Sequence, residues 1–134
     1  MEWHFKEGQP IYTQIVDQMS RFIASGSVEP GGRLPSVRDL AAEAGVNPNT
    51  MQRALAELER SGLLHSARTN GRFITDDKDV LKKLRSDLSM DYIEELFEKL
   101  EKLGLTADEI VWAVGDYAEN HHDTGHNGQT GEEK

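Results

Sequence analysis

The chain has 134 residues, no cysteine and a formal net charge of −9, which allows one small domain with an appendage and excludes disulfide frameworks and thiol chemistry. No apolar run reaches the roughly 18 residues of a membrane span, and the N-terminus lacks the apolar core of a signal peptide, so we expect a cytoplasmic protein. Residues 1–75 hold eight of the 15 basic and eight of the 24 acidic residues, so the negative charge lies almost entirely in residues 76–134.

Residues 1–35 predict one helix and the connection that follows it. The helix extends from about Pro10 to Ser25 and ends at Gly26, because apolar residues recur in it at helical spacing. Residues 27–32 (SVEPGG) form a turn, and Arg33–Pro35 is extended because a residue before proline avoids helical dihedrals. For Trp3–Phe5, a short strand and irregular structure both remain open.

Residues 34–61 predict two helices joined by a tight turn. Ser36 and Asp39 have the spacing of a capping box at the start of the first helix, and Gly45 supplies its end. Asn47 is a good N-cap and Pro48 suits the first helical position, so the second helix begins there and extends to about Ser61. Such a pair occurs both in DNA-binding proteins and as a plain packing unit.

The second of these helices has one packing face and one exposed face. The packing face holds Met51, Ala54, Leu55 and Leu58, and the opposite face holds Asn49, Arg53, Ala56 and Arg60. Short amides, Gln52 and a guanidinium near the helix start are typical of a recognition helix in the DNA major groove. Arg38 adds a separate indication, because a cation in the first turn of a helix opposes the macrodipole unless an anion such as a DNA phosphate faces it.

The stretch LLHSARTNGRFIT predicts a β-hairpin. Two short alternating runs flank Asn70-Gly71, which is a strong signal for a two-residue hairpin turn. Arg68 and Arg72 lie on either side of the tip, so the hairpin is interpreted as a wing that enters the minor groove or contacts phosphates. A hairpin that only completes the core is the alternative.

Residues 76–119 predict two further helices with a role in dimerisation. The first is acidic, about 25 residues long and ends near Leu103, with an interruption near Ser86–Ser89 left open. The second begins at a capping box formed by Thr106 and Glu109 and ends near Glu119. Their apolar residues lack a partner within so short a chain, which favours a two-fold symmetric dimer. The predicted interface comprises Leu84, Leu88, Ile93, Leu96, Phe97, Leu100, Ile110, Val111 and Val114.

The remaining sequence gives no indication of catalysis or of a cofactor. Residues 120–134 contain no apolar residue, so we expect a disordered tail. His121, His122 and His126 lack the spacing and support of a preformed metal site. No nucleophile–base pair or phosphate-binding loop occurs, so the chain is not expected to be an enzyme.

The segments PIYTQI, RLPSVRDLAAEAGVNPNTMQRALAELERSGLL and NGRFI resemble the N-terminal winged-helix domain of the GntR family of bacterial transcription regulators. The resemblance covers residues 9–75, and LGLTADEIVWAV is similar to the C-terminal region of the YtrA-like subfamily. It implies a mainly α fold with a small β wing: a winged helix-turn-helix domain in residues 1–75, followed by a short helical dimerisation region in residues 76–119.

The resemblance also implies a function and a set of DNA contacts. We expect a homodimeric, sequence-specific repressor of an inverted-repeat operator, often that of a transporter operon, with no room for a large effector domain. A small effector would sit between subunits or between the dimer arm and the DNA-binding domain. The rival interpretation is a protein-interaction winged helix without DNA binding. The implied DNA contacts are Arg38, Asn47, Asn49, Thr50, Gln52, Arg53, Asn70 and Gly71, with Arg33 and Ser36 as weaker phosphate contacts.

Overall fold

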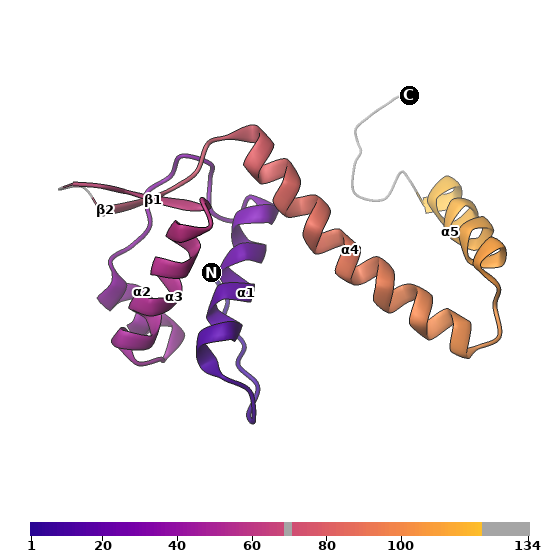
Figure 1. Ribbon diagram of the computed structural model, residues 1–134, viewed down its shortest axis with the longest axis horizontal. Helices are drawn as coiled ribbons and strands as arrows, with labels where there is room; N and C mark the ends of the chain where they lie inside the picture. Colours follow the sequence, from indigo (N-terminus) through magenta and orange to yellow (C-terminus); the bar gives the residue numbers. More distant parts are fainter. Residues whose placement is uncertain (69–70, 122–134) are drawn as a thin grey trace. The chain divides into compact units, whose positions relative to one another are not determined.

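The computed structural model describes residues 1–68 and 71–121. It confirms a mostly helical fold with a two-stranded antiparallel sheet (Figure 1). Two compact units are present, one from Met1 to Ser89 and one from Met90 onward. The elements are α1 (Ile11–Ser25), α2 (Val37–Ala44), α3 (Pro48–Arg60), β1 (Leu64–Ala67), β2 (Gly71–Ile74), α4 (Lys78–Lys102) and α5 (Ala107–His121).

The core of the first unit lies where α1 and α2 pack against α3 and the two strands cover one end of the helices (Figure 1). Ile15 and Met19 of α1 and Met51 of α3 have no exposed surface. The first turns of α4 belong to the same core, because Leu81 is buried in it and Leu84 packs against it. The apolar residues that recur at helical spacing in each segment therefore form one continuous core.

Local sequence signals set the ends of the helices as expected. The hydroxyl of Ser36 accepts a hydrogen bond from Asp39 N at 3.1 Å. Gly45 ends α2 with φ 72°, a left-handed conformation that side chains disfavour. Thr106 and Glu109 form the reciprocal capping box, with distances of 2.8 Å and 3.2 Å between donor and acceptor. These short-range predictions are confirmed.

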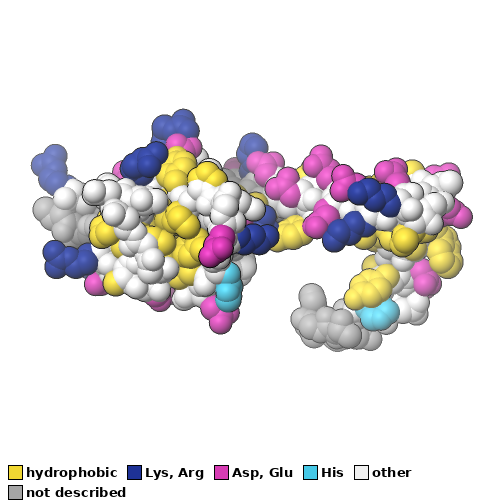
Figure 2. All heavy atoms as spheres, turned by 90° about the horizontal axis from the view of Figure 1, so that it is seen from below, with side chains coloured by type: hydrophobic (Ala, Val, Ile, Leu, Met, Phe, Trp, Pro, Cys, Tyr) yellow, Lys and Arg dark blue, Asp and Glu magenta, His cyan; other side chains and the backbone are white. Residues whose placement is uncertain are grey.

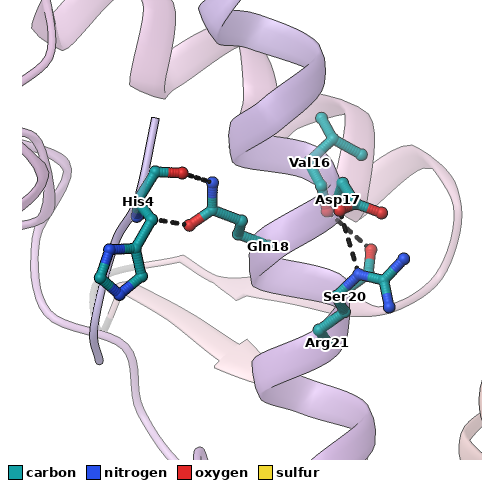
Figure 3. A network of polar contacts seen from close by, with 6 residues as sticks. All are labelled: His4, Val16, Asp17, Gln18, Ser20 and Arg21. Atoms are coloured by element: carbon teal, nitrogen blue, oxygen red, sulfur yellow. Dashed lines mark hydrogen bonds and ion pairs between the residues drawn. The ribbon is translucent and has the colours of Figure 1, made fainter. Parts of the chain in front are cut away.

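The N-terminal segment is not a strand but an irregular segment bound to α1. Two glutamines of α1 bind its backbone: Gln18 Oε1 accepts from His4 N at 3.0 Å, and Gln14 Oε1 accepts from Lys6 N at 2.8 Å (Figure 3 shows the former). The Trp3 ring also meets Phe22 edge-on, with 5.1 Å between centroids. Side-chain amides thus provide the hydrogen bonds that a neighbouring strand would otherwise supply.

The first C-terminal helix has the expected length of about 25 residues, and the second is slightly longer than expected. Helix α4 continues without interruption through Ser86–Ser89, and α5 extends to His121, two residues beyond the expected end at Glu119. Figure 2 shows Asp and Glu side chains gathered along α4. None of the helices in residues 1–68 and 71–121 is long and apolar enough to cross a bilayer. The expected tail lies outside the described residues from position 122 onward.

Candidate nucleic-acid interface

The turn between α2 and α3 fixes the start of the predicted recognition helix. Val46 N donates to Ala41 O at 3.0 Å, which closes the end of α2. Asn47 Oδ1 accepts from Asn49 N at 2.7 Å and caps α3, and Pro48 follows at the first helical position. The side-chain oxygen of Asn47 therefore caps the helix, and the side-chain NH₂ group of Asn47 remains for other contacts.

Helix α3 separates its packing residues from its polar residues. Met51, Ala54, Leu55 and Leu58 are buried, whereas Asn49, Gln52 and Arg53 are exposed. Ala56 is also exposed and adds little bulk to this polar face. Two side-chain amides and one guanidinium therefore project from the first half of the helix. This arrangement fits the hydrogen-bonding edges of bases in a major groove.

Arg53 has a partner that the sequence did not reveal. Its guanidinium carbon lies 4.9 Å from the centre of the Tyr12 ring on α1. A cation over an aromatic face gains electrostatic stabilisation and loses conformational freedom. Arg53 is therefore held at the α1 side of the exposed face.

Two further arginines are exposed near the edges of this unit. Arg38 lies in the first turn of α2 and Arg68 at the end of β1. Within residues 1–68 and 71–121, no carboxylate forms an ion pair with either side chain. Figure 2 shows Lys and Arg side chains around the end of the unit that carries the wing. Both guanidiniums are available to phosphates.

The wing has a third strand-like segment. β1 and β2 are antiparallel with Ala67 opposite Gly71. Leu34 N donates to Arg72 O at 2.9 Å and Ile74 N donates to Gly32 O at 2.8 Å, so residues 32–34 pair with β2. Sequence reasoning predicted their extended form but not this long-range pairing.

Gly71 allows the Arg33 side chain to cross the base of the wing tip. A Cβ added at Gly71 would lie 3.4 Å from Arg33 Nε, and the φ of Gly71 is +89°. Any other residue would meet both a close contact and an unfavourable backbone conformation. Arg33 is thereby placed beside the tip, whereas Asn70 lies outside the described residues.

Comparison with known proteins decides the family. The model of the gntR family of bacterial regulatory proteins matches residues 11–74. The uncharacterised HTH-type transcriptional regulator YhcF of Bacillus subtilis (strain 168) is 34% identical over 119 residues, which are 89% of this chain and 98% of YhcF. The chain belongs to the GntR family.

Other GntR-family proteins give the comparison more detail. The repressor YtrA of Bacillus subtilis is 42% identical over 72 residues, 54% of this chain and 55% of YtrA. A GntR-family regulator from Listeria monocytogenes has a solved structure with 37% identity and a TM-score of 0.74, covering 84% of this chain and 98% of its own. The AraR DNA-binding domain, solved with operator ORX1, shows 28% identity and a TM-score of 0.51 over 56% of this chain and 96% of its own. The chain is a YtrA-like, DNA-binding transcription regulator rather than an enzyme.

In this GntR-family chain, Arg72 stabilises the wing instead of projecting from it. Its Nε donates to Glu59 Oε1 on α3 at 3.2 Å, and Ser66 Oγ donates to Glu59 Oε2 at 2.8 Å. The Arg72 side chain is only 18% exposed. Hydrogen bonds from Ser66 and then Arg72 lower the pKa of the Glu59 carboxyl below its usual value. The charge of Arg72 therefore links strand to helix.

Glu59→Gln should remove a pH-dependent part of the stability. Because the folded-state pKa of Glu59 is lowered, its contribution is present above the unfolded-state pKa and is lost as the pH falls through the folded-state pKa. The difference in unfolding free energy between wild type and variant should be largest near neutral pH and shrink below about pH 4. Urea unfolding across a pH series measures it, with the exposed Glu98→Gln as control. A difference independent of pH would contradict this role of the carboxylate.

The sequence-predicted DNA contacts otherwise remain predictions with known positions. Thr50 and Arg72 are half-buried. The exposed members are Arg33, Ser36, Arg38, Asn47, Asn49, Gln52, Arg53, Arg68 and Gly71. The predicted interface therefore draws on three places: the start of α2, the first half of α3, and the wing with its third segment.

The helical region shows which predicted dimer residues are free. Ile93, Leu96, Val111 and Val114 are exposed, and Phe97, Leu100 and Leu88 are half-buried. Leu84 and Ile110 do not belong with them, because Leu84 packs against the core of its own chain and Ile110 has no exposed surface. Sequence periodicity identifies apolar residues but does not distinguish packing within the chain from packing between chains. Five further large apolar residues of the two C-terminal helices and their connection are exposed but were not included in the predicted dimer interface: Met90, Tyr92, Leu103, Trp112 and Tyr117.

Proposed function

We propose that the protein is a homodimeric repressor that binds an inverted-repeat operator through α3 and the wing. The single observation that carries this proposal is the division of α3, whose buried face holds the core and whose opposite face exposes Asn49, Gln52 and Arg53 together. Amides and guanidiniums in a major groove hydrogen-bond to adenine and guanine edges. The similarity to the repressor YtrA supports this mode of action.

The remaining cations have positions suited to the DNA backbone. The α2 N-terminus carries positive helix-dipole potential and Arg38 lies in the first turn of this helix, so this end suits a phosphate. Arg33 and Arg68 lie at the wing and suit others. Backbone contacts of this kind set orientation and register, and the base contacts of α3 set sequence preference.

Dimerisation explains why the C-terminal helices expose so much apolar surface. Trp112 is 71% exposed and Val111 is 63% exposed on α5, and Ile93 and Leu96 are exposed on α4. Large exposed apolar groups of this kind mark an interface. A two-fold symmetric pair of subunits presents two copies of α3, so the operator consists of two half-sites in inverted orientation.

In vitro selection from a randomised duplex library tests this proposal. Enriched sequences should hold two half-sites in inverted orientation, with centres about one helical turn or a multiple of it apart. Enrichment of a single half-site would argue against a dimer on DNA. No enrichment even at low salt would argue against DNA reading and would favour a protein-interaction module.

Repression is tested separately in cells. A reporter gene placed behind the selected operator should be transcribed more strongly when the regulator is absent than when it is present. Higher transcription with the regulator present would mean that it acts as an activator, and this part of the proposal would fail.

A further inference from the structure

A cleft in the first unit lies between α1, α3 and the first half of α4. Its volume is about 440 Å³, within the range of small-molecule sites. Tyr12 and Val16 of α1 and Leu84 and Leu88 of α4 supply its apolar lining. All four side chains are half-buried, so an apolar group in the cleft would contact them without displacing the core.

The hydroxyl groups of Thr13 and Ser20 in the cleft can only accept further hydrogen bonds. Thr13 Oγ1 donates to Pro10 O at 3.0 Å, and Ser20 Oγ donates to Val16 O at 2.8 Å (Figure 3 shows the latter). Each hydroxyl has one hydrogen, and both hydrogens are used in these bonds. Their oxygens retain lone pairs, so they favour a ligand that donates.

The charged groups in the lining are both negative. Asp17 and Glu57 line the cleft, and among the described residues no Lys or Arg belongs to its lining. Asp17 accepts from Arg21 Nε at 3.0 Å, and Glu57 is paired with Arg60. A carboxylate has about four acceptor positions, so each keeps capacity for another donor.

We propose that this cleft binds an amphipathic organic ammonium ion that acts as an effector. An ammonium group supplies three donors and a positive charge, which match the two carboxylates and the two hydroxyl oxygens. Its apolar part contacts Val16, Leu84 and Leu88. A carboxylate or phosphate ligand meets repulsion and finds no cation in the lining.

The cleft is connected to the DNA-reading face by two of its own lining residues. Tyr12 lies under the guanidinium of Arg53, and Glu57 is the partner of Arg60. Tyr12, Glu57 and both arginines also border one common depression. A bound cation therefore contacts the groups that hold both arginines. The effector role rests on the proposed function, whereas binding to the cleft does not.

Binding is tested without DNA by ¹H–¹⁵N NMR titration of the full chain. The probe is 4-phenylbutylammonium, with 4-phenylbutanol and 5-phenylpentanoate as ligands of matched apolar part. The amine should shift backbone signals of Thr13–Ser20 and Glu57, and bind about tenfold or more tighter than the alcohol. Equal affinity for the amine and the carboxylate, or shifts elsewhere only, would overturn the proposal.

Two variants localise the binding site. Asp17→Asn should lower the affinity for the amine but leave the affinity for the alcohol unchanged. The matched Asp91→Asn should change neither affinity. Val16→Trp should fill the cleft and lower the affinity for all three ligands. A circular dichroism spectrum like that of the wild type verifies the fold of this variant. If Asp17→Asn binds the amine as tightly as the wild type does, the assigned site is wrong.

The effector role is tested by DNA affinity with and without saturating amine. The dissociation constant for the selected operator should change about fivefold or more, and Asp17→Asn should reduce this change. Unchanged DNA affinity at saturation would overturn the effector role. If the protein binds no DNA at all, the proposed function fails, while the NMR titration still decides whether the cleft binds the amine.

Discussion

Replacing Ile93 and Leu96 together by Asp should convert the proposed dimer into monomers and weaken binding to the proposed inverted repeat by about 100-fold or more. Both side chains are exposed in the single chain, and a dimer would bury them against a partner. Two carboxylates in that contact would lose hydration without gaining a counter-charge. Each half-site would then be bound independently, so the advantage of two linked contacts would be lost.

Light scattering after gel filtration gives the mass, and fluorescence anisotropy gives the DNA affinity. Glu98→Gln on the same helix is the control and should stay dimeric. A duplex with one half-site is the second control, because its affinity should change little. A double variant that remains dimeric would place the interface elsewhere. A monomeric wild type would refute the role of the helical region, residues 76–119, in dimerisation.

Leu55→Ala should lower the free energy of unfolding by about 2–5 kcal/mol, because it leaves a cavity at the contact between α3 and the rest of the core. Leu55 is 1% exposed and lies on the packing face that orients Asn49 and Gln52. Urea denaturation followed by circular dichroism measures the change.

The matched control for Leu55→Ala lies on the opposite face of the same helix. Gln52→Ala should alter the unfolding free energy by about 0.5 kcal/mol or less, because its side chain is exposed. Similar losses for the two variants would show that α3 does not divide into a packing face and a reading face.

Short-range signals account for the part of the fold that could be predicted. Ser36, Asn47 and Thr106 cap helices as their spacing indicates. The predicted hairpin forms, but the expected two-residue Asn70-Gly71 turn is wrong, because Gly71 begins β2 opposite Ala67 and residues 68–70 lie between the paired ends. Residues 69 and 70 lie outside the described residues. Caps, turns and helical periods involve residues within a few positions of one another, so a single sequence contains the necessary information.

Contacts between distant residues account for the part that could not be predicted. Arg53 rests on Tyr12 and Arg72 is paired with Glu59, and nothing local in the sequence distinguishes these arginines from Arg38. The pairing of residues 32–34 with β2 is also long-range. Consequently, the sequence predicted which elements carry the candidate interface but did not reveal the contact between Arg72 and Glu59.

Fluorescence anisotropy with the selected operator across a salt series tests the claim that α3 reads DNA. Wild type should bind the operator far more tightly than random DNA, with an affinity that falls steeply as salt rises. Arg53→Ala should lower the operator affinity by about 1–3 kcal/mol and leave weak binding to random DNA. Equal affinity for operator and random DNA, unchanged in Arg53→Ala, would contradict the claim.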